Sequence, residues 1–233
     1  MERRGAATSP IYFPDWLISS TLSRDMRDLL TRYAYGRLLD VGCGRTPYRE
    51  MISEQIESYT ALDIAPAPEV DVVGDALNLP FENDAFQTVF TSQVLEHVTD
   101  PRRMLAELAR VVTPDGYVIL SVPQYWPEHE VPYDFHRFTI HGLQSLGTGV
   151  GLEMIHSCRQ GGGFAVAGQA INNVLAERIH FGDPSFSKLS KILRAALLCP
   201  IFLLANVTFG VLDQLLPSRD DTLGLGVVYR RLS

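Results

Sequence analysis

One short run of the chain combines an acid with two glycines, in the order Asp40-Val41-Gly42-Cys43-Gly44. Glycines at the end of an apolar β-type run permit positive φ angles and let a ligand approach bare backbone N–H groups. The carboxylate of Asp40 disfavours a phosphate here and favours a ligand with a cationic group, such as an α-amino group. Pro47 stands where a dinucleotide-binding turn has its third glycine. The run therefore predicts a nucleotide-type site that does not hold a dinucleotide.

Polar residues also end three later apolar runs. Asp63 follows Asp40 at close to the separation of about 20 residues that is typical of a ribose-binding acid. Asp75 follows the run at 70–73, and Ser92 and Gln93 follow the run at 86–91. Because the carboxyl ends of parallel strands share one edge of a sheet, we expect these side chains to converge there.

The stretch 123–139 shows no amphipathic period and is expected to be a long loop, a kind of segment that is more often functional. It supplies three candidate catalytic residues, His129, Tyr133 and His136. Histidine suits proton transfer because its unperturbed pKa lies near neutrality. His129 lies nearest the preceding strand and is the preferred base, while a role in fixing the loop stays open for each of the three.

Alternating strands and helices must position these residues. We expect strands at 37–41, 59–63, 70–73, 86–91, 117–122, 154–157 and 226–232. We expect helices at 23–34 with Ser23 as N-cap, at 48–56, at 101–112 after the N-cap Asp100, at 140–146 and at 164–179. Strands separated by helices imply right-handed crossovers and a mostly parallel sheet.

Five stretches in this order resemble the class I S-adenosylmethionine-dependent methyltransferases of the type-11-like group. They are the acidic glycine turn, 59–64, 72–81, 86–98 and 108–123, together covering much of 37–123. Thr46 departs from the pattern, because many members have a further glycine there. The stretch 132–139 is similar to a pattern in bacterial methyltransferases, several of which are encoded among glycan-building enzymes.

The resemblance implies an α/β fold with a Rossmann-like, seven-stranded, mostly parallel sheet, an antiparallel last strand and helices on both faces. It implies S-adenosyl-L-methionine as cofactor, with Asp63 on the ribose diol, Asp75 on the adenine amino group and the Ala76 backbone against the ring. The cofactor-binding residues that it implies are Asp40, Gly42, Cys43, Gly44, Asp63, Ile64, Asp75, Ala76, Leu77, Ser92 and Gln93.

A metal site is not expected. Some quinone-pathway O-methyltransferases place acidic and histidine ligands where this chain has Glu96 and His97, but Gln93 stands at their first ligand position. Two adjacent ligands do not make a site, so Glu96 and His97 are expected to support the start of a helix. The three cysteines, Cys43, Cys158 and Cys199, have no C-x-x-C spacing and indicate neither zinc nor a disulfide framework.

The last third of the chain departs from a minimal methyltransferase. Its segment 187–216 is unusually apolar, and 195–212 holds no charged residue. Such a helix is either buried or at a membrane. A packed insertion or dimer surface is favoured, and attachment to a membrane surface and a true span stay open. We expect one domain over 1–233, with an N-terminal segment at 1–36, a cofactor-binding core at 37–160, a helical insertion at 161–218 and a final strand at 223–233.

The formal net charge of −7 gives no basic surface for nucleic acid. The first residues lack an apolar signal-peptide region, so a cytoplasmic protein is expected, and association with a membrane stays open. We expect a methyltransferase that acts by O- or N-methylation on a small-molecule or glycan-type acceptor, lipid-linked glycans included. Two alternatives remain: a catalytically silent methyltransferase-like scaffold that uses the apolar insertion as an interface, and a nicotinamide-dependent oxidoreductase, against which Asp40 speaks.

Overall fold

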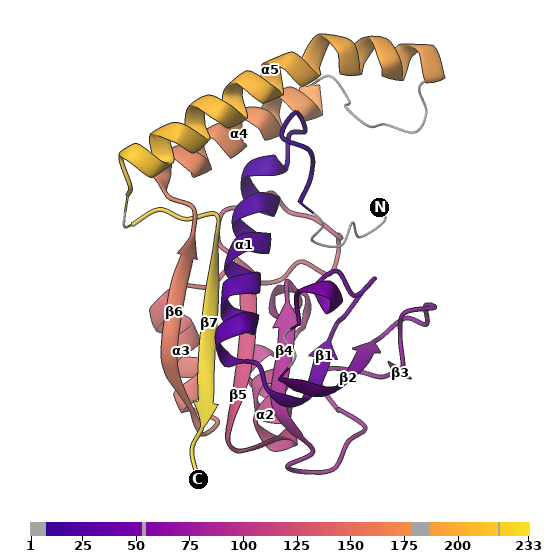
Figure 1. Ribbon diagram of the computed structural model, residues 1–233, viewed down its shortest axis with the longest axis vertical. Helices are drawn as coiled ribbons and strands as arrows, with labels where there is room; N and C mark the ends of the chain where they lie inside the picture. The colour runs from indigo at the N-terminus through magenta and orange to yellow at the C-terminus, as the bar shows by residue number, and fades with distance from the viewer. Residues whose placement is uncertain (1–7, 53–54, 179–186, 219) are drawn as a thin grey trace. The chain divides into compact units, whose positions relative to one another are not determined.

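The computed structural model describes residues 8–52, 55–178, 187–218 and 220–233. Seven strands form one sheet in the order β3-β2-β1-β4-β5-β7-β6 (Figure 1). β1 pairs in parallel with β2 and β4, β4 pairs in parallel with β5, and β7 runs antiparallel to β5. The expected mostly parallel sheet with an antiparallel last strand is confirmed. The strands are β1 Gly36–Val41, β2 Ile56–Asp63, β3 Val72–Val73, β4 Phe86–Ser92, β5 Val112–Pro123, β6 Leu152–Gln160 and β7 Gly224–Arg231.

The core lies between the sheet and the helices α2 (Pro101–Val111) and α3 (Ile140–Thr148). Asp100 caps α2 by accepting a hydrogen bond from the backbone of Arg103, as the sequence predicts. Apolar residues at helical spacing on α2, among them Met104 and Leu108, are fully buried against the strands. The second half of α1 (Trp16–Tyr33) packs on β5 and β7, where Met26 approaches Gly226.

The described residues divide into two compact units. The sheet unit comprises 24–158 and 224–233, and the helical unit comprises 8–23 and 159–223. In the helical unit, α4 (Gly163–Arg178) and α5 (Lys188–Leu215) lie side by side (Figure 1). Asp213 on α5 accepts hydrogen bonds from the N–H groups of Gly162 and Ala165 at the start of α4.

Two local predictions were wrong. The helix expected over 48–56 is a single 3-10 turn at Arg49–Met51, because Ile52 is already extended and β2 begins at Ile56. Ser23 is not an N-cap, because α1 begins at Trp16 and runs through it. The apolar periodicity that starts at Met26 marks only the half of α1 that packs on the sheet.

Candidate active site

The turn after β1 has the conformation that its glycines predict. Gly42 and Gly44 have φ angles of 74° and 54°. The N–H groups of Gly42 and Cys43 donate to the Leu62 carbonyl on β2, which fixes the turn against the neighbouring strand. A Cβ on Gly42 would lie 2.4 Å from a methyl carbon of Val94, whereas one on Gly44 would meet nothing within 4 Å. Gly42 is thus required for packing, and Gly44 borders open space where a ligand fits.

Asp63 joins the glycine turn to the end of β2. Its two carboxylate oxygens accept from the backbone N–H groups of Gly44 at 2.9 Å and Ala65 at 3.1 Å. The carboxylate is 5% exposed, while the neighbouring Ile64 side chain is 67% exposed. An acid held at a strand end beside an exposed apolar side chain can bind a polar sugar next to a flat apolar ring.

Asp40 is buried beneath the turn. It is 2% exposed, and the Tyr59 hydroxyl donates a short hydrogen bond to it. Burial, reinforced by the charge of Asp63, raises the pKa of Asp40 to about 7, against the opposing effect of the Tyr59 hydrogen bond. Burial also raises the pKa of the Cys43 thiol to about 12, so Cys43 is a packed and unreactive residue.

The segment after β3 forms a tight polar turn. The Asp75 carboxylate accepts from the Leu77 N–H at 2.8 Å, and Ala76 and Leu77 pack against the core. Arg103 on α2 donates to the Leu77 carbonyl at 2.9 Å, and Arg110 donates to carbonyls further along the same segment. The helix thereby holds the predicted adenine-binding stretch in place.

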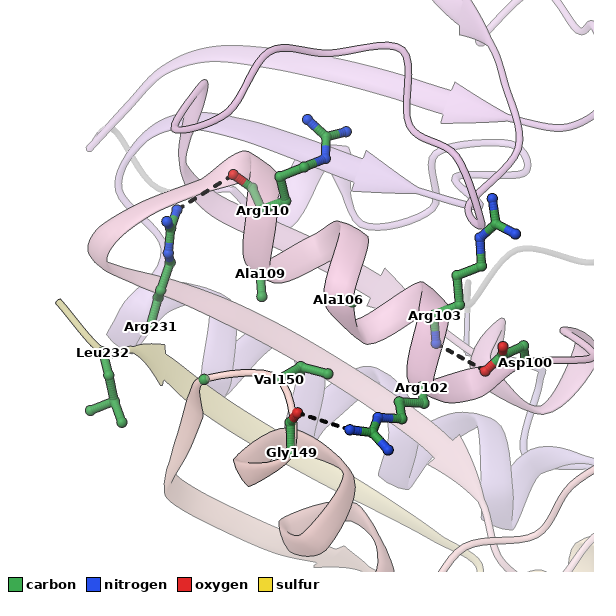
Figure 2. Close-up of a pocket in the computed structure, with 11 residues that line it drawn as sticks. Asp100, Arg102, Arg103, Ala106, Ala109, Arg110, Gly149, Val150, Arg231 and Leu232 are labelled. Atoms are coloured by element: carbon green, nitrogen blue, oxygen red, sulfur yellow. Dashed lines mark hydrogen bonds between the residues drawn. The ribbon is translucent and has the colours of Figure 1, made fainter.

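Those arginines border the pocket of Figure 2, which lies between α2 and the residues after α3. Figure 2 shows the guanidinium groups of Arg103 and Arg110 pointing away from Gly149 and Leu232 on the far side of the pocket. No residue that the sequence assigned to the cofactor or to catalysis lines this pocket. This pocket therefore does not coincide with the predicted cofactor site.

A hydrogen-bonded row of hydroxyls links three strand ends. The Tyr48 hydroxyl lies 3.0 Å from the Ser92 hydroxyl, which lies 2.8 Å from the Ser121 hydroxyl. The Gln93 side-chain amide donates to the Ser121 hydroxyl at 3.2 Å, and the Gln93 backbone adopts a φ angle of 56°. The row thus joins the segment after the glycine turn to β4 and β5. Of its three hydroxyl residues, the sequence singled out only Ser92.

An ion pair organises the loop after β5. Both guanidinium nitrogens of Arg137 donate to the Asp134 carboxylate, at 2.6 and 2.7 Å, and hold its pKa well below the usual range. Arg137 also donates to the Trp126 carbonyl. The Asp134 carboxylate accepts from the His129 backbone N–H, and the His129 Nδ1 lies 3.0 Å from it without the alignment of a hydrogen bond. The loop is a folded unit that fixes His129.

The structure brings His129 to Glu96 and His97, a grouping that the sequence did not predict. The rings of His97 and His129 lie edge to face with centroids 4.8 Å apart, and His97 Nε2 lies 3.7 Å from the Glu96 carboxylate. Glu96 is fully buried, and its carboxylate oxygens accept no hydrogen bond from the described residues. Burial raises the pKa of Glu96 to about 8 and lowers the pKa of His97.

The other two candidate catalytic residues are placed differently. Tyr133 is 64% exposed, and its carbonyl oxygen lies 2.8 Å from His97 Nδ1. The His136 ring packs beside Phe138, which is buried in the core. Only His129 therefore joins the polar cluster through its side chain. The sequence showed Glu96 and His97 as adjacent possible ligands. It did not indicate His129 as their neighbour, because His129 lies more than 30 residues later, on the loop after β5.

Residues 39–120 match the family model described as a methyltransferase domain. The matched range is less than half of the chain, and it contains every predicted cofactor residue. The expected Rossmann-like fold is confirmed.

Curated relatives are similar over part of the chain. A malonyl-[acyl-carrier protein] O-methyltransferase from Serratia marcescens is 31% identical over 117 residues, covering 44% of this chain and 46% of that protein. A phthiotriol/phenolphthiotriol dimycocerosates methyltransferase from Mycobacterium leprae is 33% identical over 96 residues, covering 35% of this chain and 36% of that protein. The chain thus spans less than half of the length of these relatives.

A solved structure shares the fold over a longer range. The 1,6-didemethyltoxoflavin-N1-methyltransferase from Burkholderia thailandensis superposes with a TM-score of 0.58 at 15% identity, covering 91% of this chain and 79% of that one. At this identity the likeness concerns the fold alone.

Proposed function

We propose that the protein transfers the methyl group of S-adenosylmethionine to a hydroxyl or amine of a small-molecule or glycan-type acceptor. The observation that carries this proposal is the convergence of the Gly42–Gly44 turn, Asp63 and the Ser92–Gln93 pair at neighbouring strand ends. Packing of the core alone does not require exposed backbone N–H groups and hydrogen-bonded polar side chains at one edge of the sheet, whereas a ligand site does.

The cofactor half fits the shape of the ligand. The open side of Gly44 accommodates the amino-acid part, and the Asp63 carboxylate accepts hydrogen bonds from the ribose hydroxyls while it keeps the turn in register. Ile64 and the Ala76–Leu77 backbone lie against the adenine, with Asp75 accepting from its amino group. Asp40 acts from beneath the turn as a buried acid that a nearby cationic ligand holds in its charged form.

When bound, S-adenosylmethionine supplies a methyl group whose carbon bonds to the acceptor's lone pair while the sulfur keeps the electron pair of the broken bond. The chain's contribution is alignment, because the leaving group is already good. The hydroxyl row from Tyr48 to Ser121 orients polar groups at the ends of β1, β4 and β5. His129, steered by Asp134, is the preferred acceptor of the proton that a hydroxyl or amine must lose.

The test is calorimetric titration of S-adenosylhomocysteine into wild type, Asp63→Ala and the control Glu57→Gln, an exposed acid on the same strand. Loss of charge-assisted hydrogen bonds worth about 1.5–3 kcal/mol predicts affinity weakened about 10- to 150-fold in Asp63→Ala only. Absence of binding by folded wild type would overturn the proposal, and NADH binding would favour the oxidoreductase. Binding without turnover of S-adenosylmethionine on any hydroxyl or amine acceptor would leave the scaffold alternative.

We further propose that α5 lies on a lipid surface. Residues Ala196–Leu215 are long and apolar enough to cross a membrane, and little of this stretch is buried. One face of the helix is apolar and exposed, with Leu197, Leu204 and Leu215 about 70% exposed. On the packed face, Leu198 and Phe202 are buried, and the buried Asn206 donates to backbone carbonyls before α1. A helix that faces water shows the reverse pattern, with its apolar side chains buried and its polar side chains exposed.

The charged residues of α5 also favour binding to a lipid surface. Its first two turns contain Lys188, Lys191 and Arg194, and the helix has no acidic residue before Asp213. Basic residues beside an apolar helix face favour anionic lipids. A membrane-bound enzyme could act on lipid-linked acceptors, and the mycobacterial relative named above is a methyltransferase of phthiotriol dimycocerosates.

Co-sedimentation with vesicles containing anionic phosphatidylglycerol tests the α5 proposal. We expect wild type to bind and the double variant Leu197→Gln/Leu204→Gln to lose binding. Leu232→Gln, which changes an exposed leucine of the sheet unit, should bind as wild type does. A wild type that stays in solution as a dimer, and becomes a monomer in the double variant, would instead establish α5 as a subunit interface.

A further inference from the structure

We propose that Glu96, His97 and His129 form a binding site for a divalent transition-metal ion of the zinc type. One ligand atom from each residue lies within 4.8 Å of the others. A set of two imidazoles and one carboxylate is a common ligand set for Zn²⁺ and Fe²⁺, and it leaves coordination positions open.

The buried carboxylate is the strongest reason for a cation here. Glu96 is 0% exposed, and neither carboxylate oxygen has a hydrogen-bond partner in the part of the chain that the structure describes. Buried carboxylates are normally paired or bound to metal, because an isolated one loses its hydration without return. Arg137, the nearby cation, is already engaged by both oxygens of Asp134.

The His97 imidazole is oriented as metal ligands usually are. His97 Nδ1 lies 2.8 Å from the Tyr133 carbonyl oxygen, a contact in which the ring nitrogen must donate. His97 Nε2 therefore keeps its lone pair, and it lies 3.7 Å from the Glu96 carboxylate. A carbonyl partner behind a ligating histidine is a usual second layer of a metal site. The His129 side chain has no such hydrogen bond, but its backbone N–H donates to the Asp134 carboxylate, which fixes the residue in the loop.

The backbone also holds the two halves of the site together. Glu96 and His97 lie in the short turn η2 (Leu95–His97), directly after β4. The Glu96 carbonyl accepts from the Phe135 N–H at 2.9 Å, which ties the loop after β5 to this turn. Tetrahedral zinc with bonds of about 2.0–2.1 Å separates its ligand atoms by roughly 3.4 Å, so binding requires a contraction of up to about 1.4 Å from the 4.8 Å limit. Side-chain rotation in the loop can supply that movement.

The site lies three residues after Gln93, on the same strand end as the proposed methyl-transfer centre. A cation there would favour the deprotonated form of an acceptor hydroxyl. With the ion bound, His129 would be a ligand, so the cation would replace His129 as the group that assists loss of this proton. Metal binding does not depend on the proposed function, whereas this role for the metal does.

The first experiment is calorimetric titration of Zn²⁺ into the chelator-treated protein, with the increase in melting temperature as a second readout. We expect one ion per chain and binding weakened at least 10-fold in Glu96→Gln, His97→Ala and His129→Ala. The control is His141→Ala, which removes an exposed histidine of α3 outside the cluster. Glu96→Gln keeps the shape of the side chain and should fold, because it removes a buried, unpaired charge.

The spectrum of Co²⁺ and a Mg²⁺ titration add independent readouts. We expect visible bands of a low-coordinate Co²⁺ complex in wild type and in His141→Ala only, and weak binding of Mg²⁺, which prefers oxygen ligands. Equal Zn²⁺ affinity in wild type, Glu96→Gln and His141→Ala, or no binding by wild type, would overturn the site. S-adenosylhomocysteine titrated into the same samples separates this failure from failure of the methyltransferase proposal.

Discussion

Replacing Asp40 by Asn should change how the stability of the protein depends on pH. Asp40 is 2% exposed, and burial raises its pKa in the folded protein from 3.8 to about 7. Well below pH 3.8 the carboxyl group is neutral in both the folded and the unfolded chain. As the pH rises through 3.8 towards 7, the unfolded chain loses this proton while the folded chain keeps it, so stability falls. Well above pH 7 the group is charged in both states, and the loss levels off.

The size of the effect follows from the pKa rise. At about 1.4 kcal/mol for each pKa unit, the ionisation of Asp40 lowers the free energy of unfolding by about 4 kcal/mol above pH 7. Asn keeps an oxygen that accepts from the Tyr59 hydroxyl but has no proton to lose. Asp40→Asn should therefore match wild type near pH 4 and exceed it by up to about 4 kcal/mol at pH 8.

The assay is urea unfolding of the cofactor-free protein at four pH values from 4 to 8.5, followed by far-ultraviolet circular dichroism. Tyr59→Phe should act in the opposite direction, because the hydroxyl favours the charged form of Asp40 and its removal extends the destabilisation to higher pH. Glu57→Gln, an exposed change on β2, should stay within about 0.5 kcal/mol of wild type. A difference between Asp40→Asn and wild type that does not grow with pH would refute the reasoning.

Further predictions concern backbone positions. Gly42→Ala should lower the melting temperature and abolish S-adenosylhomocysteine binding, because the added Cβ would lie 2.4 Å from Val94. Gly44→Ala meets no neighbouring atom and should lower the free energy of unfolding by only about 1–2 kcal/mol, through backbone strain. Differential scanning calorimetry compares the two, and equal losses would contradict the packing argument. Asp213→Asn should weaken the hydrogen bonds to the start of α4 by about 1 kcal/mol, and faster hydrogen exchange at Gly162, without change in the sheet unit, would show it.

The sequence predicted the sheet because its signals are local. Each strand is a short apolar run, and the residues proposed to bind the cofactor lie at or near the ends of these runs. The prediction of a helix over 48–56 was wrong because it rested on local propensity alone. These residues have helical propensity, but the turn after β1 and the start of β2 leave too short a segment for a helix. Burial of the Tyr48 side chain, whose hydroxyl lies close to Ser92, could not be seen from propensity.

The grouping of Glu96, His97 and His129 could not be predicted, because it depends on how a long loop folds. The sequence shows an acid and a histidine after β4, and separately a histidine-rich loop after β5. Their contact arises from the pairing of Asp134 with Arg137 within the loop and from the backbone hydrogen bond to the Glu96 carbonyl. Neither interaction leaves a periodic pattern in the sequence.

Three buried acids around one sheet edge have different physical roles, which their partners explain. Asp63 accepts hydrogen bonds from two backbone N–H groups, which compensate the burial of its carboxylate. Asp40 has one tyrosine partner and becomes charged only at a cost that a cationic ligand can offset. Glu96 has no hydrogen-bond partner among the described residues, and only a cation or a proton can compensate its burial. The protein's own contacts therefore satisfy Asp63 best and Glu96 least, so a bound cation should stabilise the folded protein most through Glu96.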